Sequence, residues 1–311
     1  MSTKAVTDVR EEGLAVGPGA APASGAPIRQ SNLWKDAWRR YIRNKGAVIA
    51  GSVFVLVLLY CLLWPFLSPY SGNEVDFTVA KQGPSLDHLL GTDKFGRDLF
   101  TRTAEGGRVS ILIGFGATLA ILLIGVVYGS ISGFVGGWLD NTLMRLLDAL
   151  YGLPYLPFAI ITLAIIGTIN AWTMVIALSI ASWFTAARIV RGQIITLKQN
   201  DYVRAARAIG ARWYRILGRH LLPNTMGVLI IAIFLELPGV ILGEAFLSFI
   251  GLGISPPDSS LGQMAEEGRA AYRSHPHIIV IPSLIIATIV LSANFIADGM
   301  RDALDPRTRE T

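Results

Sequence analysis

"DYVRAARAIGARWYRILGRHLLPN", residues 201–224, is the stretch that constrains the arrangement of this chain most strongly. It carries five arginines and one aspartate, yet uncharged runs long enough to cross a bilayer lie on both sides of it. A transmembrane helix needs about 20 consecutive apolar residues, and a segment this rich in arginine cannot lie in lipid. The chain must therefore return to water here, with membrane spans before and after.

Composition extends this conclusion to the whole chain. Of its 311 residues 52% are hydrophobic and 16% are charged, against roughly 25% charged residues in a soluble domain. No charge occurs in the 31 residues between Arg108 and Asp140 or in the 39 between Asp148 and Arg188. A run of 39 is too long for one span and suits two, with "GTINAW" (167–172) as the turn. The sequence predicts an all-α, polytopic membrane protein.

Six spans account for the hydrophobic pattern. They are predicted at about 46–67, 109–130, 146–166, 171–190, 226–250 and 277–297. With the N-terminus inside, the cytoplasmic flanks carry 16 Lys and Arg in 66 residues, whereas the external segments carry 7 in 67. Because Lys and Arg accumulate on the cytoplasmic side, both termini are predicted to be cytoplasmic.

The chain divides into four predicted parts. Residues 1–33, rich in Ala, Gly and Pro, are expected to be a disordered cytoplasmic tail. Residues 34–106 hold an interfacial helix, the first span and an external loop. Residues 107–299 form the main transmembrane domain, with a cytoplasmic segment at 192–223, and 300–311 are a cytoplasmic tail. The interfacial helix is predicted from "WKDAWRRYIRNK", in which aromatic residues recur at helical spacing with basic residues between them. The alternative is that this segment is only a basic flank that sets the orientation of the first span.

The opening stretch has the period of an amphipathic helix. Apolar and small residues recur at intervals of three and four, with the arginines between them: Tyr202, Ala205, Ala206, Ile209, Trp213, Ile216 and Leu217. Gly210 is expected to separate two short helices, and Pro223 to close the second. Two roles fit this pattern. The segment rests on anionic headgroups, or it docks a soluble partner through the small residues Ala205, Ala206 and Ala208.

A row of glycines marks the second span. Gly125, Gly129, Gly133 and Gly137 follow one another at intervals of four residues. Small residues at this spacing let a neighbouring helix approach closely. We expect Gly125 and Gly129 to form a packing face, and the last two glycines to belong to a loop.

Chemistry within the chain is limited. None of the six lysines follows a glycine, so no phosphate-binding Gly-Lys-Ser/Thr loop can be written, and any ATP must be bound by another chain. The lone Cys61 excludes disulfides and Cys-rich metal sites, and no catalytic residue, metal site or cofactor is predicted. The formal charge of +5 follows from basic cytoplasmic loops and does not indicate nucleic-acid binding.

Two acids and a proline in the fifth span are candidates for lining a pathway. Glu236 and Glu244 must face protein or water, since a charge at mid-bilayer costs at least about 2.5–3.5 kcal/mol. Pro238 frees a backbone carbonyl between them. The alternative, favoured for Glu244, is a structural hydrogen bond between helices. Outside the membrane, Asp93, Arg97 and the neighbouring Asp98 are expected to form an ion-paired turn or to touch a partner.

The stretch 201–224 resembles the cytoplasmic "EAA" signature of ABC-importer permeases. That signature is EAA, three residues, Gly, then nine residues before IxLP. Five positions match in register, namely Ala205, Ala206, Gly210, Leu222 and Pro223. Two depart from it, since Arg204 replaces the glutamate and His220 the isoleucine. The resemblance implies an ATPase-coupling helix that includes Asp201, Tyr202, Arg204, Ala205, Ala206, Ala208, Gly210 and Pro223.

Three other stretches resemble the "C" permease subunits of dipeptide and oligopeptide importers. They are "LLGTDKFGRDLFTR" (89–102) with "GGRVSILIG" (106–114), "GEAFLSFIGLGISPP" (243–257) and "NFIADGMRDALDPR" (294–307). The resemblance covers about residues 34–307 and implies the type I ABC-importer transmembrane fold in a bacterial cytoplasmic (inner) membrane. It implies a homologous permease subunit, two ATP-binding subunits that hold ATP and Mg, and an external binding protein that delivers peptides.

Alternative functions remain open at this stage. A permease of the same fold that carries nickel or another small solute would share these motifs. A proton-coupled secondary carrier would use Glu236 or Glu244 as a relay and would need no ATPase. A membrane enzyme would need clustered His, Cys or paired carboxylates at one depth, and no such cluster is visible in the sequence.

Overall fold

The computed structural model describes residues 33–255 and 257–304, and every regular element within them is helical. The α-helices are α1 (Leu33–Arg43), α2 (Lys45–Leu67), α3 (Leu99–Val135), α4 (Gly137–Tyr151), α5 (Tyr155–Ile166), α6 (Ala171–Leu197), α7 (Asp201–Ala208), α8 (Trp213–Ile216), α9 (Leu222–Leu247), α10 (Leu261–Arg269) and α11 (His277–Leu304). Short helical turns occur at Phe77–Val79, Leu217–Leu221 and Ser248–Leu252. The predicted tails, except for Leu33 and residues 300–304, lie outside the described residues.

Five of the six predicted spans are continuous helices. Within the described residues, α2, α3, α6, α9 with its flanking turns, and α11 are each long and apolar enough to cross a membrane. The third predicted span, 146–166, is not one helix: α4 and α5 meet there at an angle of 91°. Proline explains the break, because Pro154 has no backbone N–H to donate and disfavours a helical conformation at Leu153. By length and composition the pair is either a broken span or a re-entrant loop.

The helices extend beyond the uncharged stretches of sequence from which the spans were predicted. The second span was predicted at 109–130, but α3 has 37 residues and begins at Leu99. Asp98 fixes this start, since its carboxylate accepts a hydrogen bond of 2.8 Å from the Thr101 backbone N–H. Absence of charge marks the part of a helix that lies in lipid, whereas capping groups in the aqueous phase decide where it ends.

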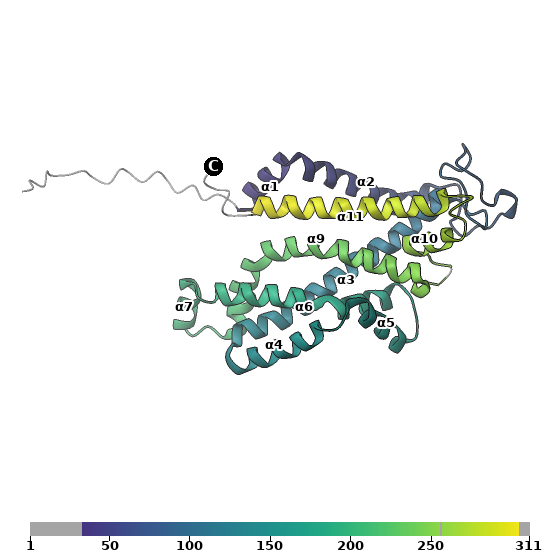
Figure 1. Ribbon diagram of the computed structural model, residues 1–311. Helices are drawn as coiled ribbons and strands as arrows, with labels where there is room; N and C mark the ends of the chain where they lie inside the picture. Colours follow the sequence, from purple (N-terminus) through teal and green to yellow (C-terminus); the bar gives the residue numbers. More distant parts are fainter. Residues whose placement is uncertain (1–32, 256, 305–311) are drawn as a thin grey trace, which may run out of the picture.

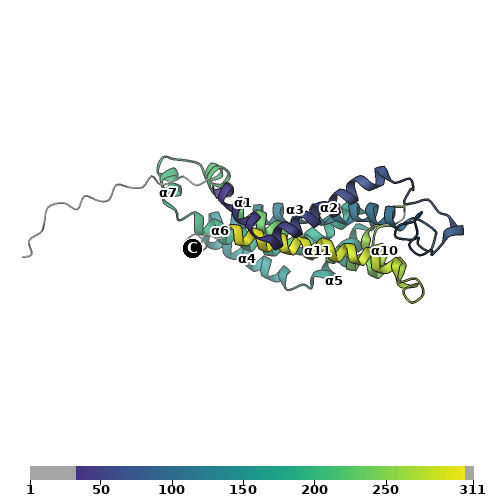
Figure 2. The ribbon, with the colours of Figure 1, turned by 90° about the horizontal axis from the view of Figure 1, so that it is seen from above.

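The bundle is built around α3, which crosses it obliquely (Figures 1 and 2). One apolar core lies between α3, α5, α6 and α9, and a second lies between α2, α3, α9 and α11. Two ion pairs join α4 to α6: a bidentate, partly buried one between Asp140 and Arg191 at 2.6 and 2.7 Å, and an exposed one between Asp148 and Arg188 at 2.6 Å.

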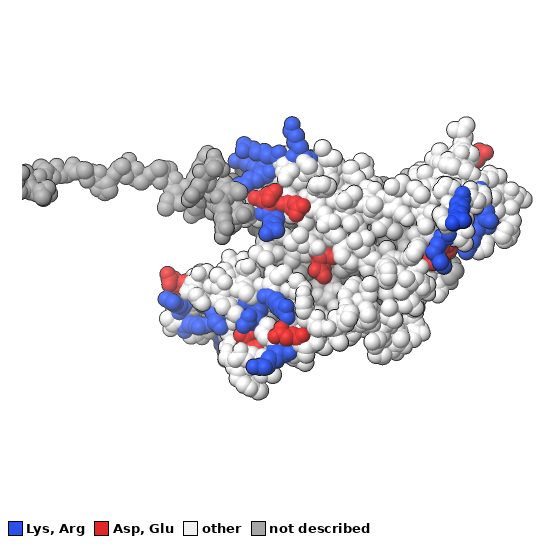
Figure 3. Space-filling model, viewed as in Figure 1, with Lys and Arg blue, Asp and Glu red and all other residues white. Residues whose placement is uncertain are grey.

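The two ends of the bundle differ from its middle in the number of charged side chains. Helices α1 and α7 and the last turns of α11 lie at one end, while the loop before α3 and helix α10 lie at the other (Figures 1 and 2). Charged side chains gather at these two ends, and the band between them shows little charge (Figure 3). A helix is present where the interfacial helix was predicted: it is α1, in which Trp38 and Tyr41 stack at 5.9 Å, and its place at the membrane interface stays a prediction. The segments predicted to share a side of the membrane therefore do share an end of the bundle.

Candidate functional site

The predicted division of the basic segment at Gly210 is confirmed. Helix α7 ends at Ala208, Gly210 adopts a positive φ of 81°, and α8 begins at Trp213. Only glycine reaches this backbone conformation without steric cost. The predicted role of Pro223 is wrong, because it lies in the first turn of α9 and not at the end of α8. The chain is helical without a break from Trp213 to Leu247, and proline is tolerated within this run because the turn directly before it, Leu217–Leu221, is π-helical.

Helix α7 has a buried side and an exposed side. Val203 and Ala206 are buried among Val190, Ile194 and other apolar side chains of α6 and α8. The predicted exposed patch is therefore corrected at Ala206, which faces the bundle. The exposed residues are Asp201, Tyr202, Arg204, Ala205, Arg207, Ala208 and Ile209. Among them Ile209 is 85% exposed, which is unusual for an isoleucine at the aqueous end of a bundle.

Polar contacts that the sequence did not predict tie the segment around α7 to α3. The Lys198 ammonium donates to the carbonyl oxygens of Gly133 and Phe134 at 2.9 and 3.1 Å, which caps the C-terminal end of α3. The Arg207 guanidinium lies 5.5 Å from the centre of the Phe134 ring, and the Trp213 ring lies 6.4 Å from it. The segment around α7 thus contacts both α3 and α6, so a displacement of α7 would shift its contacts with both helices.

The glycine row packs α3 against α6. A Cβ atom added at Gly125 would lie 2.6 Å from the Ala186 Cβ, and one at Gly133 would lie 2.8 Å from the Arg191 carbonyl oxygen. Gly129 approaches the α6 backbone equally closely. The packing face predicted at Gly125 and Gly129 is present, and the expectation that Gly133 lies in a loop is wrong. Gly137 is likewise not in a loop: it is the first residue of α4, directly after the break at Gly136, and with φ of 62° and open space around it, it takes no part in the packing face.

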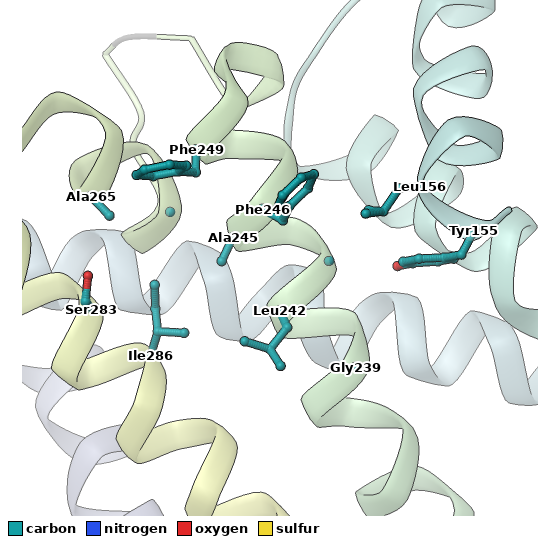
Figure 4. A pocket seen from close by; sticks show the side chains of 12 residues that line it. Tyr155, Leu156, Gly239, Leu242, Ala245, Phe246, Phe249, Ala265, Ser283 and Ile286 are labelled. Atoms are coloured by element: carbon teal, nitrogen blue, oxygen red, sulfur yellow. The ribbon is translucent and has the colours of Figure 1, made fainter. Parts of the chain in front are cut away.

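An apolar chamber of about 540 Å³ opens between α5, α9, α10 and α11 (Figure 4). Its wall on α9 and the turn that follows it is made by Leu242, Phe246 and Phe249, which are substantially exposed. Tyr155 approaches from α5, so closely that a Cβ at Gly243 would lie 2.5 Å from its hydroxyl oxygen. The remaining lining residues are Leu156, Gly239, Ala245, Gly262, Ala265, Ser283 and Ile286. No sequence pattern predicted this chamber, because most of its lining residues are ordinary apolar ones from four separate segments.

The predicted pathway residues lie beside this chamber and not among its lining. Glu236 is half-buried on α9, and Pro238 is buried within the same helix. Glu244 is fully buried, and its carboxylate accepts hydrogen bonds from the Ser248 hydroxyl at 2.8 Å and the Ser110 hydroxyl at 3.0 Å. These contacts favour the structural alternative for Glu244. A pathway role for Glu236 stays a prediction.

The turn around Asp93 is ion-paired at Asp93 and Arg97, as one of its two interpretations predicted, but Asp98 is not part of this network: its carboxylate caps α3 and lies 3.0 Å from the His88 Nδ1. Arg97 donates to Asp93 through Nε at 2.6 Å, and Arg102 donates to the same carboxylate at 2.6 Å. Both arginines also reach Glu267 of α10, at 2.8 and 2.9 Å. Sequence reasoning missed Arg102 and Glu267, since Glu267 stands 165 residues beyond Arg102. All four side chains are buried or nearly so.

The fold and these sites together define a class of protein. The chain is an all-helical, multi-span membrane protein with an apolar chamber towards one end and a short exposed helix at the other. The arrangement suits passage of a solute and contact with a partner.

Comparison with known proteins identifies the family. Residues 125–310 match the family described as "Binding-protein-dependent transport system inner membrane component", and residues 32–84 match "N-terminal TM domain of oligopeptide transport permease C". The chain belongs to the family of binding-protein-dependent transport system inner membrane components. The resemblance to the "C" permeases of dipeptide and oligopeptide importers is thereby confirmed.

Two relatives from Bacillus subtilis span nearly the whole chain. The "Dipeptide transport system permease protein DppC" is 41% identical over 276 residues, 88% of this chain and 86% of that protein. The "Oligopeptide transport system permease protein OppC" is 40% identical over 296 residues, 94% of this chain and 97% of that protein. Among solved structures, an inward-facing MetNI methionine ABC transporter matches with a TM-score of 0.53 at 19% identity, over 66% of this chain and 96% of its own. At this identity the match shows the fold, that of a type I ABC-importer permease.

Proposed function

We propose that this chain forms one half of the pathway by which an ATP-driven importer carries di- or oligopeptides across a bacterial cytoplasmic membrane. The observation that supports this most is the similarity, at about 40% identity over most of the chain, to permeases named for dipeptide and oligopeptide transport. The chain contributes no ATP-binding loop of its own in this proposal. Two separate ATP-binding subunits hold ATP and Mg and supply the energy.

The apolar face of α9 supports a second permease subunit as the other half. Leu235, Leu242 and Phe246 lie on one side of that helix and are all exposed, and the chamber opens beside them. A homologous subunit packed there would close the chamber from that side and bury these side chains. Glu236 on the same helix would then face the shared pathway, where water or a polar solute satisfies its carboxylate.

Helix α7 supports contact with an ATPase subunit on the cytoplasmic side. Tyr202, Ala205 and Ile209 recur at intervals of three and four, so they share one exposed face. An apolar side chain that projects from a short helix, flanked by a small residue, fits a groove on a soluble protein. Because Val203 and Ala206 pack on α6, closure of the ATPases would move α6 and, through the glycine row, α3.

The experiment is reconstitution of the four proposed components with an external binding protein in liposomes, with radiolabelled trialanine as the transported probe. Ile209→Asp and Gly210→Asp should keep membrane insertion but reduce uptake at least tenfold and abolish stimulation of ATP hydrolysis by loaded binding protein. Arg212→Gln with Arg215→Gln is the matched control on the polar face and should retain most activity.

The outcomes separate the competing functions. Normal stimulation in both Asp variants, with a loss in the double Gln variant, would make α7–α8 a headgroup-binding segment. Uptake that persists without ATP would indicate a proton-coupled carrier. ATP-driven uptake of nickel ions and not of trialanine would keep the importer and change its substrate.

A further inference from the structure

The external helix α10 is held in place by two separate groups of buried polar side chains. One group holds its N-terminal end against α9 and α3, and the other holds its C-terminal half against the loop before α3. Neither group contacts the chamber directly, yet Gly262 and Ala265 of α10 form part of the chamber wall (Figure 4). The position of α10 therefore decides the shape of the chamber.

At the N-terminal end, the contacts start from Glu244. Its carboxylate accepts from Ser248 and Ser110, and the Ser110 hydroxyl in turn accepts from the Leu261 backbone N–H at 3.1 Å. Ser260, the residue that caps α10, donates to the Ser248 hydroxyl at 3.2 Å. Glu244 and Ser260 are both fully buried. One carboxylate thus connects α9, α3 and the first turn of α10.

At the other end, Glu267 binds both Arg97 and Arg102. These arginines share Asp93, so the ion-paired turn before α3 is locked to α10 as one unit. Buried hydrogen-bonded groups in one network strengthen one another, so this network holds α10 more firmly than its separate pairs would. The two sequence stretches "LLGTDKFGRDLFTR" and "GEAFLSFIGLGISPP" thus each supply one of the two attachments of α10.

The turn that follows α9 has the backbone geometry of a hinge. After Ser248 the helix widens into a π-helical turn, and Gly251 leaves it with φ of 91° in open space. The seam beyond the hinge is tight: a Cβ at Gly262 would lie 2.6 Å from the Ala245 Cα and 2.7 Å from the Ala245 carbonyl oxygen. The tight seam and the hydrogen bonds of Ser248 and Ser260 together fix one position of α10 against α9.

We propose that Glu244 and Glu267 are positioning residues that seat α10 as the outer wall of the chamber, and that α10 separates from α9 each time the pathway opens to the outside. The proposal rests on the proposed transport function. Glu244 acts through the serines and the α10 backbone, and does not touch the transported solute.

A reversible cross-link tests the movement. In a Cys61→Ala background, Ser248→Cys with Ser260→Cys places two sulfur atoms where hydroxyl oxygens lie 3.2 Å apart, so a shift of about 1 Å brings them to the about 2 Å of a disulfide bond. In the complete reconstituted complex, oxidation should abolish uptake of trialanine and stimulation of ATP hydrolysis by binding protein, and reduction should restore both. Full activity of the oxidised, cross-linked complex would overturn the proposal.

Substitution of the two glutamates tests positioning apart from movement. The readout is the labelling rate of Ala265→Cys by an impermeant maleimide from outside, again without Cys61. The parent complex should label slowly at rest and at least tenfold faster during ATP hydrolysis. Glu244→Ala and Glu267→Ala should label at the fast rate even at rest. Glu244→Gln, which can still bond both serines, should restore slow labelling.

Glu266→Ala is the matched control, because Glu266 is a neighbour on α10 whose contact with Arg269, at 3.4 Å, is exposed. It should label like the parent. Equal resting rates in Glu244→Ala, Glu267→Ala and Glu266→Ala would overturn the positioning role, whatever the cross-link shows about movement. These rates do not depend on which solute is carried. If ATP accelerates labelling but trialanine is not taken up, the peptide proposal fails and the inference about α10 stands.

Discussion

Replacement of Gly129 by alanine tests the close packing of α3 on α6 with the smallest possible change. The added Cβ would lie 2.9 Å from both the Arg191 backbone nitrogen and the Val190 Cβ, and nearer still to the Ala187 carbonyl oxygen. Two of these three atoms belong to the backbone, so they cannot rotate away. Overpacking of a methyl group costs about 1–3 kcal/mol, and we expect the upper half of that range here. This cost is partly offset, because alanine is about 1 kcal/mol more favourable than glycine in the interior of a helix.

The expected net loss is thus about 1–2 kcal/mol in the free energy of unfolding, which shifts the unfolding equilibrium by roughly tenfold. It can be measured by titrating the detergent-solubilised chain with SDS and following tryptophan fluorescence. Gly192→Ala is the matched control on α6. No atom lies within 4 Å of its added Cβ, so only the gain of helix propensity remains and stability should rise by up to about 1 kcal/mol.

The two substitutions therefore have opposite expected signs. If Gly129→Ala proves as stable as Gly192→Ala, the α3 and α6 backbones do not approach as closely as described, and the glycine row needs another explanation. A loss of assembly with a sister subunit, at unchanged stability of the isolated chain, would likewise contradict packing within one chain.

Further predictions concern ion pairs and topology. Asp140→Asn should lower the free energy of unfolding by about 1.5–3 kcal/mol, because it weakens a partly buried bidentate contact with α6. Asp148→Asn breaks an exposed pair of the same two helices and should cost under about 1 kcal/mol in the same titration. For topology, a Cys61-free chain in sealed cells should react with an impermeant thiol reagent at Ser71→Cys and not at Asn200→Cys; the reverse pattern would invert the orientation. Ser259 looks equally external in the sequence, but it is buried and should react slowly.

Several features of the fold could be read from local sequence because they depend on local properties. Lack of charge placed the spans, since lipid excludes charge wherever it occurs along the chain. The helix break at Gly210 was predictable because a positive φ is a property of one residue. Asp93 with Arg97 was predictable as an ion pair, because the two stand four residues apart.

Features that depend on a partner distant in sequence could not be read in this way. In a membrane bundle most helix faces are apolar, so hydrophobic periodicity no longer tells which face packs inward. This loss of signal hid the chamber, whose walls come from four helices. Ala206 lies in the amphipathic helix α7, where alanine fits a buried and an exposed face equally well, and it was assigned to the exposed patch although it is buried against α6.

The sequence by itself determined that the solvent of this protein is lipid, that the chain crosses it about six times, and that a short basic helix returns to water between spans. Each of these follows from composition and spacing within a few tens of residues. Only the tertiary structure decided that the glycines of α3 face α6, that Glu244 holds the start of α10, and that Glu267 completes the ion network of Arg97 and Arg102. Close packing and buried hydrogen bonds pair particular atoms from distant segments, and no local pattern encodes which segments will meet.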